Sequence, residues 1–186
     1  MKHLLFVLAT FFGINALAQD SSVHHLPQPH LPIPRAVIDT PPYQKDPHIP
    51  TFSLLLTDSS HFSQLNIPKN KPTIIGYFSP ECSHCQGDAK RIAEKLDSLK
   101  DITFIWSSSH DVDKIKDFAI KYNLAGLKNM IFGKDEKYSI PVYYKIQYTP
   151  YFAVYGKDGI FFTDFRQGVS PSDLIAAVEE SNKKKK

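Results

Sequence analysis

The sequence predicts an α/β domain in which a central mixed β-sheet is flanked by helices on both faces. Three observations lead to this prediction. An apolar run at residues 73–78 precedes a stretch with helical periodicity, and a second strand–helix pair follows over residues 102–124. Two apolar runs within residues 151–165, joined by a glycine-containing loop, then precede a last helix. A β-α-β half followed by a β-β-α half requires a mixed sheet, with the overall order β-α-β-α-β-β-α.

The first half begins with a short apolar run, Phe52–Leu56, which ends at the turn signal Asp58-Ser59-Ser60. Thr73–Phe78 is rich in β-branched and aromatic residues, as expected of a buried central strand. Apolar residues then recur at helical spacing, with charged residues on the opposite face. These apolar positions are Ala89, Ile92, Ala93, Leu96 and Leu99.

The second strand–helix pair consists of a strand at Ile102–Trp106 and a helix at Asp111–Leu124. Asp111 or Asp113 is expected to cap this helix, because carboxylates accept hydrogen bonds from its first backbone N–H groups. Residues 126–142 carry a charged run and no clear period. We expect them to form an irregular insertion that includes one helical turn.

The last three elements are a hairpin and a helix. Tyr151–Tyr155 and Ile160–Phe165 flank a loop that contains glycine and aspartate, a strong signal for antiparallel strands. Pro171–Asn182 is the final helix, with Ser170 as its expected N-cap.

The first residues have the pattern of an export signal. Lys2 and His3 precede an apolar block at Leu4–Ile14, and Ala16-Leu17-Ala18 offers small residues for cleavage. The alternative is an uncleaved membrane anchor, but the block is shorter than the ~20 residues that span a bilayer. We therefore expect residues 1–18 to be removed near Ala18, and the mature protein to be extracytoplasmic, either periplasmic or secreted.

The rest of the chain divides into three parts. Residues 19–48 are rich in proline and are expected to form an extended linker or a strap over the domain. One domain spans residues 49–182, and the lysines at 183–186 form a basic, solvated tail. The net charge of +3 is too small to suggest a nucleic-acid partner. We expect a monomer with no stable insertion into a membrane.

The chain has two cysteines, and they stand as Cys82-Ser83-His84-Cys85 between the predicted central strand and its helix. A helix N-terminus favours a thiolate over a thiol, and this spacing lets one sulfur reach the other. A structural disulfide is the alternative in an oxidising compartment. Because a bridge over so short a loop constrains the unfolded chain little, redox chemistry is favoured.

This motif in its context resembles the thioredoxin fold, here with an N-terminal extension. A second marker supports the resemblance, since Thr149-Pro150 directly precedes the strand at Tyr151–Tyr155. The resemblance implies a cis peptide bond at Pro150, lying beside the dithiol. The export signal, the N-terminal segment and the insertion are most similar to the exported redoxins of the TlpA and ResA type.

That resemblance implies a thiol–disulfide oxidoreductase that needs no cofactor. It would exchange disulfides with client proteins and be recharged by an upstream redox partner, with a reductase favoured over an oxidase. Cys82 would be the exposed nucleophile, because it lies nearest the helix N-terminus, and Cys85 would resolve the mixed disulfide. His84 lies between them and can stabilise the Cys82 thiolate, which makes a disulfide more oxidising.

The sequence departs from the thioredoxin pattern at two positions. Glu81 replaces the usual tryptophan, and its charge would oppose His84 by raising the pKa of Cys82. Gly76 stands where thioredoxins carry a buried acid, so Glu81, another acid or a water would have to move the proton. Glu81 can equally be an exposed side chain. The direction of electron flow stays open.

Other functions fit the sequence less well. A peroxidase needs proline and threonine or serine at fixed distances before its reactive cysteine, and neither cysteine has both. A carrier of copper(I) or zinc could use Cys82, Cys85 and His84, joined by His110 if the strand at 102–106 ends beside them. A redox-inactive binding module is the third alternative. No resident metal is expected.

Overall fold

The computed structural model describes residues 40–183. The expected export signal and most of the proline-rich segment lie outside this range, as do the last three lysines. The strands are β1 (Ser53–Leu56), β2 (His61–Ser63), β3 (Thr73–Tyr77), β4 (Thr103–Ser108), β5 (Met130–Lys134), β6 (Tyr151–Tyr155) and β7 (Phe161–Arg166). The helices are α1 (Pro42–Lys45), η1 (Gln64–Asn66, a 3-10 turn), α2 (Ser83–Ala93), α3 (Leu96–Leu99), α4 (Val112–Lys121), α5 (Ser139–Tyr144) and α6 (Pro171–Lys183).

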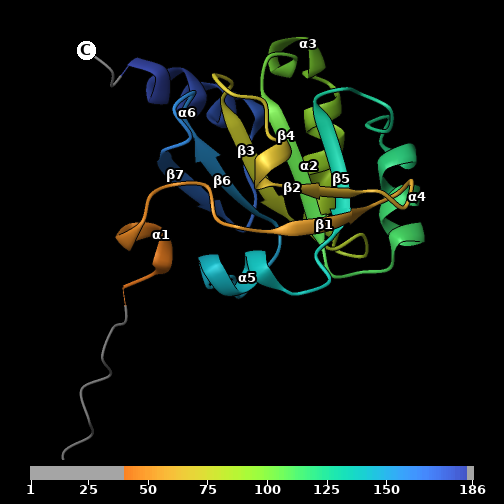
Figure 1. The fold of residues 1–186 in the computed structure, drawn as a ribbon. Coiled ribbons are helices and arrows are strands. Elements are labelled where there is room, and N and C mark those ends of the chain that lie inside the picture. Colours follow the sequence, from red (N-terminus) through yellow and green to blue (C-terminus); the bar gives the residue numbers. More distant parts are fainter. Residues whose placement is uncertain (1–39, 184–186) are drawn as a thin grey trace, which may run out of the picture. The chain divides into compact units, whose positions relative to one another are not determined.

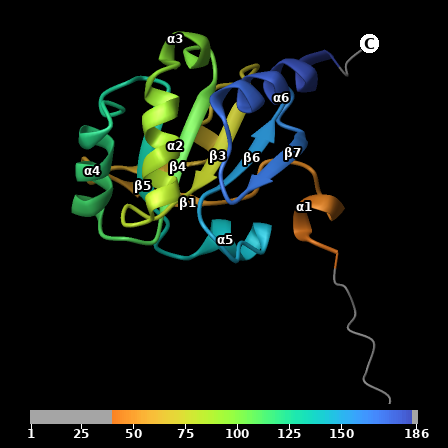
Figure 2. The same cartoon turned by 180° about the vertical axis from the view of Figure 1, so that it is seen from behind.

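The seven strands form one mixed sheet in the order β2-β1-β5-β4-β3-β6-β7, which confirms the predicted fold class. The central strand β3 runs parallel to β4 and antiparallel to β6. Its register with β6 pairs Thr73 with Tyr155 and Tyr77 with Tyr151, so these two pairs mark opposite ends of β3. Helices α2, α4 and α6 cover one face of the sheet, and α1 and α5 lie over the other (Figures 1 and 2).

The insertion at 126–142 is more regular than expected. The prediction of an irregular segment is wrong for Met130–Lys134, which forms β5 and pairs with both β4 and β1. Its apolar part is only three residues long, too short to show a period, and pairing with neighbouring strands decides its structure. Gly133 permits the approach of β1, because a Cβ there would lie 2.8 Å from the Cβ of Leu54.

The single helical turn expected in the insertion is α5, and a buried carboxylate holds its first turn. Asp135 is fully buried and accepts hydrogen bonds from the backbone N–H groups of Ser139 (3.1 Å) and Ile140 (2.8 Å). These bonds satisfy donors that have no partner within the helix. The charged run at 134–137 therefore contains a capping residue.

Two helix predictions need correction. The helix expected to run through Leu99 is divided into α2 and α3 by Glu94 and Lys95. Asp111 occupies the N-cap position of α4 but makes no capping hydrogen bond, since its carboxylate contacts Lys134 instead (3.1 Å). The cap predicted for α6 is present, because the Ser170 hydroxyl accepts a hydrogen bond from the backbone N–H of Asp173 (3.1 Å).

Aromatic side chains fill the core on both faces of the sheet. Under α2 and α4, the indole of Trp106 stacks between Phe104 and Phe132, with ring centroids 5.0 and 5.5 Å apart. The opposite face holds a tyrosine cluster, in which the hydroxyls of Tyr144 and Tyr155 are hydrogen-bonded to each other. The members of this cluster are Tyr43, Tyr77, Tyr144, Tyr151 and Tyr155.

The described part of the proline-rich segment packs against this tyrosine cluster. Tyr43 of α1 is buried, and its hydroxyl accepts a hydrogen bond from Arg166 (3.1 Å). The hydroxyl of Tyr143 on α5 donates to the backbone carbonyl of Asp46 (2.9 Å). His48 forms a single β-bridge with Ile160. Residues 40–48 therefore lie along the face that also carries α5. Within residues 40–183, no helix has the length and apolar character needed to cross a membrane.

We expect the protein to lose stability steeply above pH 10. Burial raises the pKa values of Tyr144, Tyr151 and Tyr155, so these side chains keep their protons in the folded state while the unfolded chain loses them. Each of these tyrosines lowers the free energy of unfolding by about 1.4 kcal/mol per pH unit, so the three together lower it by about 4 kcal/mol per pH unit. Urea denaturation at pH 9, 10 and 11 measures this slope.

Two tyrosine variants test the assignment. Tyr144→Phe should reduce the alkaline slope by about 1.4 kcal/mol per pH unit. Tyr148→Phe should leave it unchanged, because Tyr148 is 67% exposed. A free energy of unfolding that stays constant between pH 10 and 11 would contradict the prediction.

Candidate active site

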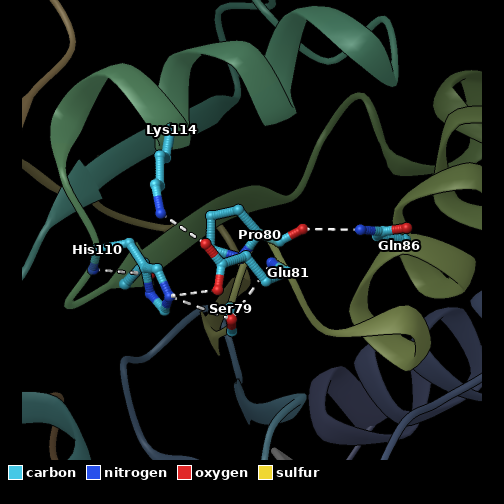
Figure 3. Close-up of polar contacts among 7 residues, drawn as sticks. Ser79, Pro80, Glu81, Gln86, His110 and Lys114 are labelled. Atoms are coloured by element: carbon cyan, nitrogen blue, oxygen red, sulfur yellow. Dashed lines mark hydrogen bonds and ion pairs between the residues drawn. The ribbon is translucent and has the colours of Figure 1, made fainter.

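The cysteine pair lies at the carboxyl end of β3, where the chain turns into α2. Phe78 anchors this turn, since its ring packs against Phe118 with centroids 4.6 Å apart. The backbone N–H of Cys82 donates to the carbonyl of Ser79 (3.1 Å), and Cys82 is the N-cap of α2. The side chain of Gln86 then donates to the carbonyl of Pro80 (2.9 Å; Figure 3). The loop before Cys82 is thus tied to the helix after it.

The two sulfurs have different environments. Cys82 is partly exposed, whereas Cys85 is fully buried, and both are free thiols. Burial acts to raise the pKa of Cys82, but hydrogen bonds from the backbone and thiol of Cys85, the Thr149 side chain and the backbone of His84 outweigh it. The pKa of Cys82 is therefore lowered. For Cys85 burial dominates and raises the pKa to about 12. One sulfur is prepared to act as a thiolate and the other is held as a thiol.

The structure brings Thr149 and Pro150 to the cysteine pair. The Thr149–Pro150 peptide bond is cis, as the resemblance implies. The carbonyl oxygen of Thr149 lies 3.6 Å from the sulfur of Cys82, and Pro150 is buried. Both residues directly precede β6, which pairs with β3. An incoming polypeptide that reaches Cys82 would meet this segment.

Glu81 belongs to a polar cluster on the α4 side of the cysteine loop (Figure 3). Its carboxylate accepts a hydrogen bond from Lys114 (2.6 Å) and lies 4.0 Å from the ring of His110. The His110 ring also contacts the hydroxyl of Ser79 (3.4 Å). The bond from Lys114 lowers the pKa of Glu81, whose side chain is 63% exposed. Glu81 is therefore an exposed, ion-paired residue and not a buried proton acceptor.

His84 is exposed on the first turn of α2. Within residues 40–183 its imidazole takes part in no hydrogen bond. Its backbone, rather than its ring, acts on the Cys82 thiolate. The ring lies at a cavity of about 440 Å³ between α2 and the loop that joins β7 to α6.

Gly76 leaves no space for the acid that thioredoxins carry at this position. A Cβ at Gly76 would lie 3.0 Å from two ring carbons of Phe152, which fills the neighbouring volume. A longer carboxylic side chain would require that ring to move. Position 76 therefore supplies no carboxylic acid that could exchange a proton with Cys85.

A buried acid that the sequence analysis did not identify lies one turn beyond Cys85. Asp88 is 1% exposed, forms an ion pair with Arg91 and accepts a hydrogen bond from the backbone N–H of Val169 (3.3 Å). Burial raises its pKa, against the opposing charge of Arg91. Its spacing could have indicated that Asp88 is buried, because Asp88 shares a helix face with Cys85 and Ile92. Its bonds hold the β7–α6 loop against α2.

We expect Asp88→Ala to destabilise the protein by about 1–3 kcal/mol, because the buried N–H of Val169 loses its acceptor. Asp88→Asn should cost less, since an amide oxygen can still accept that bond. Glu94→Ala is the control at an exposed position of the same segment. Urea denaturation at pH 7 measures the differences. Equal stability of Asp88→Ala and the parent protein would contradict this role.

The carrier alternative requires a set of metal ligands. Within residues 40–183, no three histidine, cysteine or acidic side chains are arranged to hold a metal ion. His110 does lie at the end of β4 beside the cysteine loop, as expected if that strand ends there. Its contacts are with Ser79, Ser108 and Glu81.

Comparison with solved structures identifies the fold. A secreted disulfide oxidoreductase of Mycobacterium tuberculosis, homologous to E. coli DsbE, matches with a TM-score of 0.59 and 22% identity, over 69% of this chain and 95% of that one. The chain has the thioredoxin-like fold. The thioredoxin domain of a thiol-disulfide oxidoreductase from Bacteroides vulgatus matches with a TM-score of 0.58 and 14% identity, over 72% and 94% of the two chains.

The thioredoxin-like fold is shared by proteins of more than one function. A peroxiredoxin-like protein from Aquifex aeolicus matches with a TM-score of 0.59 and 13% identity, over 72% of this chain and 85% of that one. No protein-family model and no curated protein matches the sequence. At these identities the comparisons establish the fold, and the function has to be argued from the site.

Proposed function

We propose that the protein is a thiol–disulfide oxidoreductase that exchanges disulfides with client proteins through Cys82 and Cys85. The observation that carries this proposal is the asymmetry of the pair. Cys82 is partly exposed with a lowered pKa, and Cys85 is buried with a raised one. A structural disulfide has no need of this difference, whereas a nucleophile and a resolving thiol do.

The site supports a two-step exchange. The Cys82 thiolate attacks one sulfur of a client disulfide, a mixed disulfide forms, and the other client sulfur leaves as a thiolate. The thiol of Cys85 then passes its proton to the departing client thiolate and attacks the Cys82 sulfur. This closes a Cys82–Cys85 disulfide and releases the second client thiolate. Two electrons pass from the protein to the client, and an upstream dithiol returns them by the same exchange in reverse.

A reductase is favoured over an oxidase by the position of His84. An imidazole bonded to the Cys82 sulfur would stabilise the reduced protein and make its disulfide strongly oxidising. In the described chain the ring of His84 is exposed and makes no hydrogen bond. Hydrogen bonds from Cys85, Thr149 and the backbone of His84 stabilise the Cys82 thiolate instead, so the ring of His84 adds no further stabilisation to the reduced protein.

We also propose that the protein works outside the cytoplasm. The support is the signal-like pattern of residues 1–18 and the secreted character of the mycobacterial protein that shares its fold. Expression of the full chain in a bacterial host, followed by fractionation and mass spectrometry, tests this. Cleavage after Ala18 with recovery outside the cytoplasm is expected. Retention of the uncleaved chain in the cytoplasm would overturn the proposal.

The activity is tested by equilibrating the protein with glutathione buffers and measuring the fraction of oxidised pair. A potential near the thioredoxin value of about −270 mV would support a reductase, and one above about −180 mV would assign an oxidase. Reduction of insulin disulfides by the reduced protein is the matching kinetic assay. A pair that neither equilibrates with glutathione nor reduces insulin would overturn the proposal.

A further inference from the structure

A cavity of about 390 Å³ lies at the end of the sheet opposite to the cysteine pair. It is lined by the start of β3, the segment from η1 to Lys71 and the turn between β6 and β7. At this end of the sheet, Thr73 begins β3 and pairs with Tyr155, the last residue of β6. The cysteine loop follows Tyr77, at the other end of β3. The cavity is therefore separate from the proposed redox site.

Three lysines line this cavity, and they carry its charge. Lys69, Lys71 and Lys157 are all exposed, and none forms an ion pair with a residue of the described chain. One acid, Asp158, also lines it, but an oxygen of its carboxylate already accepts a hydrogen bond from the backbone N–H of Ile160 (3.1 Å). Three cations against one acid leave the cavity positively charged.

Neutral donors complete the lining. Thr73 is 1% exposed, and its buried hydroxyl has no hydrogen-bond partner among residues 40–183. Buried hydroxyls are usually paired, so one that is unpaired beside a cavity has a hydrogen bond to offer a ligand there. The side chain of Gln64 accepts a bond from Phe52 through its oxygen, which leaves its amide N–H groups available. The cavity thus combines positive charges with directed donors.

The surface next to the cavity carries charges of both signs, since Lys71 and Lys157 also line a neighbouring cavity that contains Asp101 and Glu179. The backbone N–H of Lys157 donates to the side chain of Asn182 (3.4 Å), so the end of α6 lies beside the cavity. Lys183 follows at once and begins the sequence of four closing lysines. Leu65, at the rim of the cavity, is 86% exposed. Proteins that bind anionic membrane surfaces commonly combine basic side chains with an exposed apolar side chain.

We propose that this cavity binds a phosphate group, carried either by a soluble phosphate or by an anionic phospholipid headgroup. Lys69, Lys71 and Lys157 supply the charge, and Thr73 and Gln64 donate hydrogen bonds to the phosphate oxygens. Lysine ammonium groups suit this role because they act as point charges that can approach a phosphate from several sides.

The test uses the full chain and two probes. Inorganic pyrophosphate, followed by calorimetry, represents the soluble source. Vesicles of phosphatidylglycerol in phosphatidylcholine, compared with pure phosphatidylcholine in a flotation assay, represent the lipid source. Binding of either anionic probe is expected, and the probe that binds identifies the source. Binding of neither, at low and at physiological salt, would overturn the proposal.

Two triple lysine variants test whether the anionic probe binds in this cavity. Replacing Lys69, Lys71 and Lys157 together by glutamine should weaken it about tenfold to a hundredfold. The matched control replaces Lys90, Lys116 and Lys128, which are exposed lysines outside the cavity, and should bind nearly as well as the parent. An equal loss in both triple variants would show an effect of net charge alone and overturn the site.

Thr73→Val gives a second measure that changes no charge. Because the hydroxyl has no partner in the described chain, the variant should remain folded, and it should bind the probe severalfold more weakly. If Thr73→Val and the triple lysine variant of the cavity both bind like the parent, the proposal is wrong. Insulin reduction should be unchanged in all of these variants, which separates this site from the proposed redox function.

Discussion

Cys82→Ser should reduce insulin reduction to the rate seen without protein, whereas Cys85→Ser should form stable mixed disulfides with its clients. The serine hydroxyl at position 82 is not ionised near neutral pH and cannot attack a disulfide. In Cys85→Ser the thiolate of Cys82 still attacks, but no second sulfur is available to release the product. Non-reducing electrophoresis and mass spectrometry of the covalent species measure the outcome.

The double variant, with serine at both positions, is the control and should capture nothing. Covalent products that form equally with Cys82→Ser would mean that Cys85 is the attacking sulfur. Their absence from Cys85→Ser, with Cys82 still free to react, would favour the redox-inactive binding module. This experiment therefore separates the two functions that share the same motif.

The two thiols of the reduced protein should differ by orders of magnitude in their rate of alkylation. At pH 8 a thiol whose pKa is about 12, as for Cys85, is ionised to about one part in ten thousand. Cys82, with a pKa below its ordinary value of 9.0, is ionised to more than about one part in ten. The thiolate fractions therefore differ by at least about a thousandfold, and the greater intrinsic nucleophilicity of the more basic sulfur offsets part of this difference.

Iodoacetamide labelling from pH 5 to 10, read by mass spectrometry of the peptides, measures both rates. The rate at Cys82 should rise to a plateau with a midpoint below 9.0. Cys85→Ala should shift this midpoint upward, since the sulfur of Cys82 then loses the side-chain donor at position 85. His84→Gln should leave it nearly unchanged, because the ring makes no hydrogen bond in the described chain. A midpoint at or above 9.0 in the parent protein would contradict the proposed thiolate.

The sequence was informative where a local pattern and the tertiary structure agree. The strand at Thr73–Phe78, the hairpin within 151–165 and the cap at Ser170 each have strong local signals, and the structure contains all three. The strand β5 has only three apolar residues before Gly133, and its structure depends on pairing with β4 and β1. Such pairing cannot be read from the segment itself.

The surroundings of the cysteine pair show the same limit. The motif and Thr149-Pro150 could be identified from the sequence, but their neighbours could not. Lys114 lies 33 positions from Glu81 and is brought to it by the start of α4. Phe152 fills the space beside Gly76 because β6 pairs with β3. In each case the tertiary structure determines which residue is the neighbour, and the sequence around the site does not predict it.

The length of β3 has a consequence for how the two ends of the molecule influence each other. From Thr73 to Tyr77 the strand advances about 13 Å. The Debye length at physiological ionic strength is about 8 Å, so an ion held by the exposed lysines at the Thr73 end acts only weakly on the partly exposed sulfur of Cys82 at the other end. Filling the lysine-lined cavity should therefore leave the redox potential of the cysteine pair unchanged. A protein bound to a phosphate through this cavity would keep Cys82, at the other end of β3, free to react.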